Sequence, residues 1–424
     1  MTNIRSIALK VLNRCVSAEQ YSNLALDAVL RREALSAADR GLLTALVYGT
    51  IERQITLDYQ IDALAARGTG KLDLETRNLL RLGLYQLAYL DRVPDHAAVH
   101  ETVELAPRRT KGFVNAILRA FLRAEKRIAL PDAEREPIAY LSVRYSFLPA
   151  LCEIFAERFG MERTESLLAA FNRQPPLTLR VNTLKCTREQ LLEKLLAAGL
   201  RAEPTAESQT GIRVSGAPVS ELPGFTEGLF FVQDEASQLC VEALDARAGM
   251  TVLDACACPG SKSFGAAADM QNKGRVVSCD LHQNKLSLVK GGAERLGISI
   301  IETQARDARE PNAAWSGAFD RVLCDVPCSG FGVFAKKPEL RYKDPQKSAA
   351  LPEIQRAILE NASTYVKTGG SLVYSTCTVL PEENGENVVR FLASHPEFTL
   401  MRDRTLYPDV DDTDGFYFAV MRRS

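Results

Sequence analysis

Two cysteines stand directly after strand-like segments near the carboxyl end of the chain. Cys328 lies in the turn 325–330, which follows the apolar pair 322–323, and Cys377 follows the apolar residues 372–374. In a sheet of parallel strands the carboxyl ends meet at one edge, and ligands bind there. A thiol placed at such an edge can act as a nucleophile. These two positions therefore indicate covalent catalysis by cysteine.

The other eight cysteines favour a plainer interpretation. Cys324 directly precedes the turn, and we predict that it points into the sheet as a buried hydrophobic thiol. The same is expected of Cys15, Cys152, Cys186, Cys240, Cys256, Cys258 and Cys279. Zinc is the alternative for Cys256 and Cys258, but their spacing and the Pro259 that follows are a poor match to structural zinc sites. No ligand set is formed by His96, His100, His282 and His395, so no metal is predicted.

A turn of small residues between a strand-like and a helix-like segment predicts a ligand site. Asp254 ends the strand, and the turn contains Cys256, Ala257, Cys258, Pro259, Gly260, Ser261 and Lys262. Small residues let a ligand approach the backbone, and the helix that follows offers N–H groups. The spacing is neither a dinucleotide fingerprint nor a P-loop, since Ser261 separates Gly260 from Lys262. An ordinary turn between a strand and a helix is the alternative.

Two aspartates follow the next strand-like segments. Asp280 comes directly after 275–279, where an acidic residue binds a ribose diol in related sheets. Asp307 follows the third strand-like segment, 298–301, at a position suited to the edge of an adenine. Either residue alone has the alternative of a loop cap or a solvated charge. Together the two predict an adenosine-containing ligand.

These positions require a parallel sheet to bring them together. From residue 249 onward, helix-like stretches alternate with five short β-rich segments: 251–255, 275–279, 319–324, 371–375 and 416–421. This rhythm predicts right-handed βαβ units and a doubly wound, mostly parallel sheet. Between about 140 and 231, the strand-like segments 177–181 and 211–214 and the helix-like stretches 148–159 and 188–198 indicate a small α/β module.

The first 123 residues have a helical pattern throughout. Ser36 precedes an apolar run as an N-cap would, and residues 79–84 are apolar on nearly every side, as in a central helix. The charged stretch 123–137, bounded at its end by Pro137, is the best candidate for a linker. We therefore expect an all-helical domain before the α/β part.

Composition and charge exclude several classes of protein. The chain has 424 residues, 46% of them apolar, and 52 basic against 53 acidic side chains, so neither a single small module nor a disordered chain fits. Residues 1–127 hold 19 basic and 14 acidic side chains, which makes the helical part the basic part. No apolar run has the length of a membrane span, and residues 1–17 lack the apolar core of a secretory signal. We expect a cytoplasmic protein with no membrane partner.

These motifs resemble, in order, those of the RsmB-type (Sun/Fmu) cytosine-5 methyltransferases of small-subunit ribosomal RNA. The resemblance covers nearly the whole chain and is carried by 180–183, 231–238, 254–262, 325–330, 374–378 and 381–384. The helical start is similar to the antitermination factor NusB. By this resemblance we expect a NusB-like helical domain over 1–130, a small α/β module like an RRM over 139–231, and a Rossmann-like class I methyltransferase domain over 232–424.

The resemblance implies a role for each candidate residue. The turn 256–262, with Asp280, Asp307 and Asp325, would bind S-adenosylmethionine. Cys377 would be the nucleophile that adds to cytosine C6, Cys328 would help to release the product, and Asp325 would also hold the N3 and amino edge of the base. The partner would be RNA, with the cytosine single-stranded or flipped out of its stack. The stretch 108–111 is one candidate phosphate contact, with an ordinary solvated face as the alternative.

Three positions depart from the family pattern. Ser261 stands where a glycine is usual, Val326 where a proline is usual, and Phe331 where a threonine is usual. The first two leave the residues with implied roles in place, and the third bears on the substrate pocket. The same chemistry on transfer RNA is one alternative, and a non-catalytic RNA-binding or assembly factor is another. A monomer is the default expectation.

Overall fold

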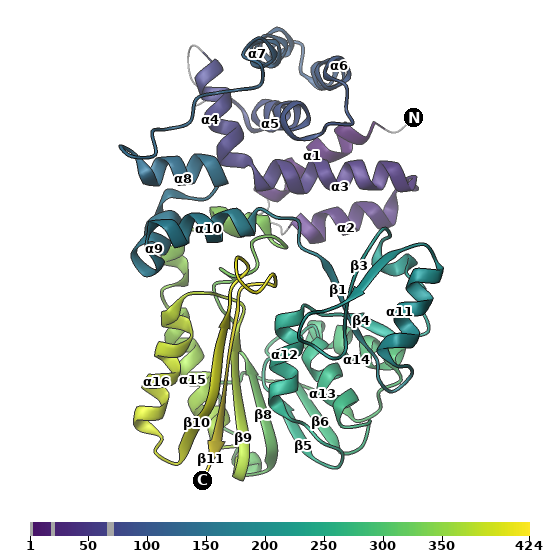
Figure 1. The fold of residues 1–424 in the computed structure, drawn as a ribbon, viewed down its shortest axis with the longest axis vertical. Coiled ribbons are helices and arrows are strands. Elements are labelled where there is room, and N and C mark those ends of the chain that lie inside the picture. The colour runs from purple at the N-terminus through teal and green to yellow at the C-terminus, as the bar shows by residue number, and fades with distance from the viewer. Residues whose placement is uncertain (1–2, 18–21, 66–71) are drawn as a thin grey trace. The chain divides into compact units, whose positions relative to one another are not determined.

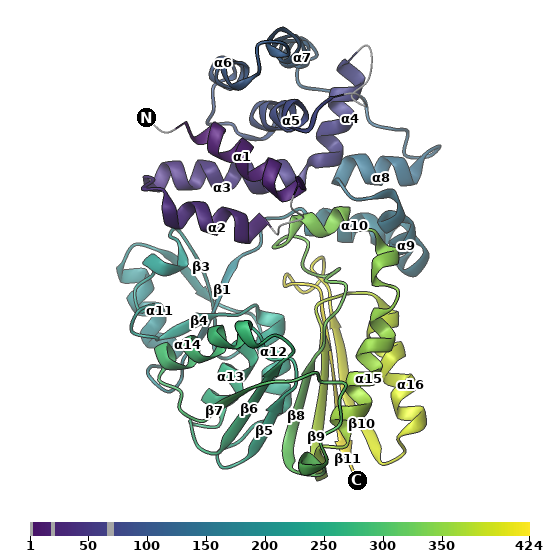
Figure 2. The same cartoon turned by 180° about the vertical axis from the view of Figure 1, so that it is seen from behind.

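The computed structural model describes residues 3–17, 22–65 and 72–424, which form two compact units (Figures 1 and 2). The first unit comprises Met1–Asn172 together with Phe334–Pro345. The second comprises Arg173–Val333 and Gln346–Ser424. The three domain ranges expected from the sequence do not coincide with these units, and they stay a prediction.

The first unit is helical, as its sequence pattern predicts. Ser36 is the N-cap of α3, where its side chain accepts a hydrogen bond from the Asp39 N–H. Leu79, Leu80 and Leu84 of α5 are fully buried, which confirms the central helix. The helices are α1 Ile4–Ser17, α2 Ser22–Arg32, α3 Ala37–Glu52, α4 Gln54–Leu64, α5 Leu74–Tyr89, α6 Asp95–Leu105, α7 Lys111–Arg123, α8 Pro137–Tyr145, α9 Pro149–Phe159 and α10 Met161–Phe171.

A short segment from the carboxyl-terminal half completes the core of this helical unit. Phe334 is fully buried and packs edge-on against Phe147 and Phe171, with ring centroids 5.0 and 4.8 Å away. Arg341, in the 3-10 helix η4 (Pro338–Tyr342), is also fully buried and donates to the Phe171 carbonyl. Residues 334–345 are therefore a structural part of a unit from which they are distant in sequence.

The second unit begins with a four-stranded antiparallel sheet in the order β2-β3-β1-β4. The predicted strands at 177–181 and 211–214 are confirmed as β1 and β3. The helix predicted at 188–198 is confirmed as α11, which begins with a capping box between Thr187 and Gln190. The elements are β1 Leu177–Val181, α11 Arg188–Ala197, β2 Arg201–Pro204, β3 Gly211–Ser215 and β4 Phe230–Val232.

A seven-stranded sheet in the order β10-β11-β9-β8-β5-β6-β7 forms the rest of this unit. The five strands from β9 to β7 are parallel, and β10 and β11 are antiparallel. The strands are β5 Thr251–Asp254, β6 Arg275–Asp280, β7 Ile301–Ala305, β8 Phe319–Asp325, β9 Val366–Thr376, β10 Phe398–Leu406 and β11 Phe416–Arg423. The predicted doubly wound, mostly parallel sheet is confirmed.

Helices cover both faces of this sheet (Figure 1). Val252 of β5 packs on the side of α12, α13 and α14, whereas the next residue, Leu253, packs on the side of α15 and α16. Successive side chains of a strand point to opposite faces, which explains why both residues of this apolar pair are buried. The helices are α12 Glu235–Leu244, α13 Ser261–Asp269, α14 Leu286–Leu296, α15 Leu351–Ser363 and α16 Gly385–Ser394.

Four strands differ from the sequence prediction. In the antiparallel sheet, β2 and β4 were not predicted. The other two strands are in the large sheet. The third strand was expected at 298–301, but β7 covers Ile301–Ala305. The apolar run 298–301 misled because it is a loop that packs its Ile298 into the core after the left-handed Gly297 ends α14. Strand β10 was not predicted at all, because it is an edge strand with mostly exposed side chains and no clear alternation.

In the described part of the chain, no single helix combines the length and the apolarity of a membrane span. Among the described helices, α8 and α9 have that length and apolarity only when they are taken together, and the chain bends by 115° between them.

Candidate active site

The predicted site residues follow the parallel strands along one edge of the large sheet. Cys377 comes directly after β9, Asp325 ends β8, the turn 256–262 follows β5, Asp280 ends β6, and Asp307 lies two residues after β7. Since these strands are neighbours in the order β9-β8-β5-β6-β7, their carboxyl ends form one continuous row. We call the part at β9 and β8 the thiol end and the part at β5, β6 and β7 the loop end.

The thiol end brings the two predicted cysteines into contact. The sulfur atoms of Cys328 and Cys377 are 3.1 Å apart, and the Cys377 N–H donates to the Cys328 sulfur at 3.3 Å. Both residues are partly exposed and neither is in a disulfide. The hydrogen bond to Cys377, burial and the nearby Glu383 carboxylate together raise the pKa of Cys328 well above its usual value. The two thiols are thus close enough for one base to touch both.

Asp325 links the thiol end to the loop end. Its carboxylate accepts hydrogen bonds from the Lys262 ammonium at 2.6 Å and from the Ser375 hydroxyl at 2.8 Å. Burial acts to lower the pKa of Lys262, but Asp325, Cys240 and Asp254 together outweigh this effect, and the pKa lies above its usual value. The sequence assigned a role to both residues without indicating that they pair. One oxygen of Asp325 is therefore committed to Lys262.

The turn 256–262 is fixed by its backbone. The Ala257 N–H donates to the Cys279 carbonyl at 2.7 Å, which ties the turn to β6. Gly260 has φ +115°, and a β-carbon there would lie 2.5 Å from the Phe264 ring. Asp254 at the end of β5 is buried, and this burial raises its pKa to about 7 although the Ser263 hydroxyl donates to it. Its other carboxylate oxygen is buried with no hydrogen-bond partner.

The two aspartates of the loop end differ in their surroundings. Asp280 is partly exposed and accepts a hydrogen bond from the His282 N–H at 2.9 Å. Asp307 is bound by the Arg309 guanidinium at 2.6 Å, and these hydrogen bonds lower its pKa. Leu281, beside Asp280, is 57% exposed. Both carboxylates are at the row of strand ends, as expected, but Asp307 is already paired.

The remaining cysteines follow the prediction only in part. Cys152, Cys240, Cys279 and Cys324 are buried as expected. The expectation is wrong for Cys15, Cys186, Cys256 and Cys258, which are half-buried. The last two lie in the small-residue turn. Among the residues that the structure describes, no group of three His, Cys, Asp or Glu side chains is arranged to hold a metal ion.

Two buried polar residues beside Cys328 were missed as functional candidates. Glu383 and Gln355, which are 2% and 0% exposed, contact the backbone on either side of this cysteine. Glu383 is in the motif 381–384. Acidic residues that closely follow a strand-like segment were the signal by which it could have been identified. Gln355 lies on α15 and gives no sign of its role in the sequence.

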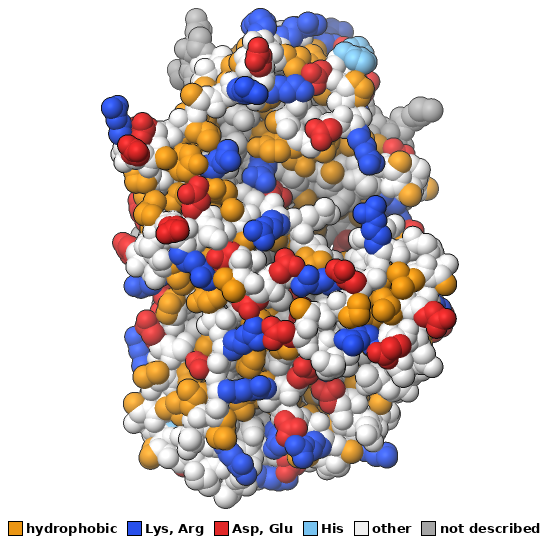
Figure 3. Space-filling view, in the orientation of Figure 1, with side chains coloured by type: hydrophobic (Ala, Val, Ile, Leu, Met, Phe, Trp, Pro, Cys, Tyr) orange, Lys and Arg blue, Asp and Glu red, His pale blue; other side chains and the backbone are white. Residues whose placement is uncertain are grey.

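Several charged side chains outside the candidate site are paired. The face in Figure 3 shows Lys and Arg interspersed with Asp and Glu. Two residues of the candidate patch 108–111 are in ion pairs. Arg109 pairs with Asp73 at 3.0 Å and Lys111 with Glu104 at 2.8 Å. The mixed surface agrees with a net charge of −1.

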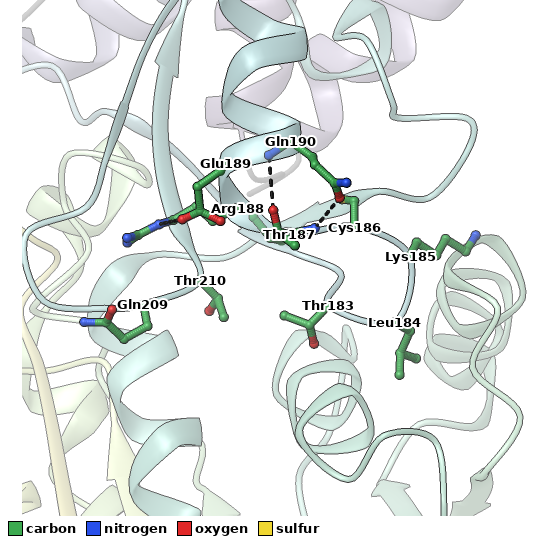
Figure 4. Close-up of a pocket in the computed structure, with 11 residues that line it drawn as sticks. Thr183, Leu184, Lys185, Cys186, Thr187, Arg188, Glu189, Gln190, Gln209 and Thr210 are labelled. Carbon is green, nitrogen blue, oxygen red and sulfur yellow. Dashed lines mark hydrogen bonds and ion pairs between the residues drawn. The ribbon is translucent and has the colours of Figure 1, made fainter.

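A cavity of about 470 Å³ lies in the antiparallel module, at the start of α11 (Figure 4). Its two cationic side chains already have backbone partners, because Lys185 donates to the Glu227 and Arg295 carbonyls and Arg188 to the Ser208 carbonyl. The thiols are on the other sheet, at its row of strand ends. This cavity is therefore separate from the candidate active site.

A doubly wound sheet with a glycine-containing turn after its first strand, and acidic residues after the next strands, defines a Rossmann-like methyltransferase domain. The family model described as 16S rRNA methyltransferase RsmB/F matches residues 241–422. The NusB family matches residues 2–123, and the ferredoxin-like domain of RsmF/B-like methyltransferases matches residues 151–220.

Two relatives match this chain over its full length. The probable ribosomal RNA small subunit methyltransferase B of Bacillus subtilis is 39% identical, over 100% of this chain and 99% of the relative. Its counterpart in Synechocystis is 36% identical, over 100% of both. A crystal structure of a methyltransferase homologue from Pyrococcus horikoshii, 26% identical, covers 68% of this chain and 99% of its own with a TM-score of 0.61. The chain belongs to the RsmB family of ribosomal RNA small subunit methyltransferases.

Proposed function

We propose that this protein transfers a methyl group from S-adenosylmethionine to C5 of a cytosine in small-subunit ribosomal RNA, through a transient bond between Cys377 and C6 of the base. The observation that carries this proposal is the contact between the Cys328 and Cys377 sulfurs, 3.1 Å apart, beside Asp325. A scaffold protein has no need of two touching thiols at the ligand edge of its sheet.

The loop end has the features that the methyl donor needs. Gly260, with φ +115° and the Phe264 ring packed against it, gives the turn a backbone shape that other residues rarely adopt. The unpartnered oxygen of Asp254 and the carboxylate of Asp280 are acceptors, and a sulfonium ligand carries positive charge. When bound, the donor supplies an electrophilic methyl group. Residues 256–262, Asp280, Asp307 and Asp325 are the proposed binding residues.

The thiol end has the features that the base needs. Cytosine C5 is a weak nucleophile until a thiolate adds to C6 and makes the ring electron-rich at C5. Cys377 forms that bond in our proposal, and the bond breaks again after C5 has taken the methyl group and lost its proton. Cys328 assists the departure of the Cys377 sulfur. The Asp325 oxygen that faces Ser375 is the proposed contact to the N3 and amino edge of the base.

The RNA must present its cytosine outside a stacked helix. The C6 atom is attacked from the face of the ring, and neighbouring bases cover both faces in a duplex. The proposed substrate is therefore a loop or a flipped nucleotide. The excess of basic residues in the first 127 positions supports phosphate contacts by the helical unit. A cytoplasmic monomer is part of the same proposal.

Methyl transfer tests the proposal directly. The purified protein is incubated with labelled S-adenosylmethionine and either ribosomal or transfer RNA, as the natural chain and as Cys377→Ala, Cys328→Ala and the control Cys186→Ala. We expect label on ribosomal RNA with the natural chain and the control, none with Cys377→Ala, and slow release with Cys328→Ala. Label on transfer RNA alone would overturn the substrate, and absence of label on any RNA would favour a non-catalytic factor.

A further inference from the structure

Cys328 is held from both sides by two buried side chains. The Glu383 carboxylate accepts the N–H of Ser329, the next residue, at 2.9 Å. The Gln355 amide donates to the carbonyl of Pro327, the preceding residue, at 3.0 Å. The same Gln355 amide donates to Glu383 at 2.7 Å, so the two residues form one clamp around the cysteine.

The clamp also reaches the strand that leads to Cys377. The Tyr374 hydroxyl, on β9, donates to the Glu383 carbonyl at 2.6 Å. The Ser329 and Thr378 hydroxyls are hydrogen-bonded at 3.0 Å, which joins the two cysteine-bearing turns directly. Each of these four side chains is buried. Hydrogen bonds between buried groups therefore set the relative placement of the two sulfurs.

Glu383 is the carboxyl member of this clamp. A buried carboxylate is retained where its hydrogen bonds compensate for the loss of water, as the Ser329 N–H and the Gln355 amide do here. Its negative charge disfavours a second negative charge nearby. Cys377, Glu383 and Tyr374 interact electrostatically with Cys328, and none of these three groups is a cation that would stabilise a Cys328 thiolate.

We propose that Glu383 is a positioning residue that holds Cys328 as a neutral thiol with its hydrogen directed at the Cys377 sulfur. This inference rests on the proposed function and assigns unequal roles to two thiols that the sequence presents as alike. A neutral Cys328 donates a hydrogen bond to Cys377, which stabilises the Cys377 thiolate before it attacks and again when it leaves the base. Cys377 is thereby the nucleophile and Cys328 the donor.

Alkylation of Cys328 tests this role without RNA or methyl donor. In a Cys377→Ser background, the rate of iodoacetamide modification at Cys328 is measured against pH by mass spectrometry of the peptide. Glu383→Gln keeps an oxygen that can accept the Ser329 N–H but removes the charge. We expect its titration midpoint to fall by at least about one pH unit, which is a roughly tenfold faster reaction at neutral pH.

Two further variants separate charge from geometry. Glu386→Gln makes the same charge change on the neighbouring helix, where Glu386 is 53% exposed, and its midpoint should match the background. Glu383→Asp keeps the charge but shortens the side chain, so the midpoint should stay while release of methylated RNA slows. An unchanged midpoint in Glu383→Gln would overturn the proposal. If that variant does not fold, release at the natural rate by Glu383→Asp would overturn it.

The two proposals fail in different ways. A chain that methylates no RNA would refute the proposed function, while the alkylation midpoint would still report on Glu383. A chain that methylates ribosomal RNA normally with an unmoved midpoint would refute only the role of Glu383.

Discussion

The two ends of the strand row are built by different means. At the thiol end, buried side chains such as Glu383, Gln355 and Tyr374 hold the cysteines in a continuous hydrogen-bonded network. At the loop end, small residues and backbone hydrogen bonds shape the turn, and Leu281 is left exposed. Bond formation needs atoms held in a fixed geometry, whereas a ligand site needs space. The contrast supports our proposal that the chemistry takes place at one end and donor binding at the other.

The largest expected effect separates the two ends most sharply. Cys377→Ala should lower methyl transfer by roughly a thousandfold or more, because in our proposal Cys328 donates a hydrogen bond and does not form the bond to C6. Binding of S-adenosylmethionine, measured by calorimetry, should stay within about twofold of the natural chain. A parallel loss of donor binding would show that the two ends are not independent.

The second effect is a dependence of stability on pH at the loop end. Burial raises the pKa of Asp254 to about 7 in the folded chain, above its value in the unfolded chain. Asp254 therefore binds a proton more tightly in the folded chain than in the unfolded chain. The free energy of unfolding that this contributes at low pH is lost as the pH rises to 7. Relative to Asp254→Asn, the natural chain should lose about 2 kcal/mol of unfolding free energy between pH 5 and 7.5.

Denaturant unfolding at both pH values measures this difference. Asp320→Asn is the control, since the pKa of Asp320 is lowered by Lys367 and the Thr251 N–H against the effect of burial. The difference in unfolding free energy between Asp320→Asn and the natural chain should change with pH in the opposite sense, or not at all, between pH 5 and 7.5. A constant difference between Asp254→Asn and the natural chain would contradict the raised pKa.

The third effect tests the pair that joins the two ends. Lys262→Met removes the partner of Asp325 and leaves that carboxylate partly buried, which should cost about 2 kcal/mol of unfolding free energy. Lys367→Met is the matched control, because Lys367 is 42% exposed in its pair with Asp320 and its loss should cost under about 1 kcal/mol. Equal losses of unfolding free energy in the two variants would show that the Lys262–Asp325 pair stabilises the fold no more than the Lys367–Asp320 pair.

The smallest effect is expected from adding a β-carbon at Gly260. Gly260→Ala places a β-carbon against Phe264 at φ +115°, and we expect a loss of about 1 kcal/mol in unfolding free energy with about tenfold weaker donor binding. Gly291→Ala, on α14 with open space around it, should instead stabilise the chain slightly. Calorimetry and denaturant unfolding give both quantities. Unchanged donor binding in Gly260→Ala would show that the backbone shape at Gly260 does not matter for donor binding.

The sequence predicted what depends on local pattern. Four of the five parallel strands contain a short apolar run, so their positions and the residues that follow them could be predicted directly. The start of β7 was misplaced because the buried loop before it is as apolar as a strand, and β10 was missed because an edge strand needs no apolar face.

Contacts between distant segments could not be predicted. The Lys262 and Asp325 pair joins a helix and a strand that are 63 positions apart. The Glu383 and Gln355 clamp joins a 3-10 helix to α15. Residues 334–345 complete the core of the helical unit although both neighbouring stretches are in the other unit. Each contact depends on tertiary packing, which no periodicity in the sequence records.

The covalent step is the central claim, and a trapped complex tests it most directly. Cys328→Ala is incubated with ribosomal RNA and S-adenosylmethionine, the protein–RNA complex is isolated under denaturing conditions, and the peptide that carries the nucleotide is identified by mass spectrometry. We predict a methylated cytosine on Cys377. A nucleotide on any other residue, or methylated RNA formed with no complex at any time, would contradict the account.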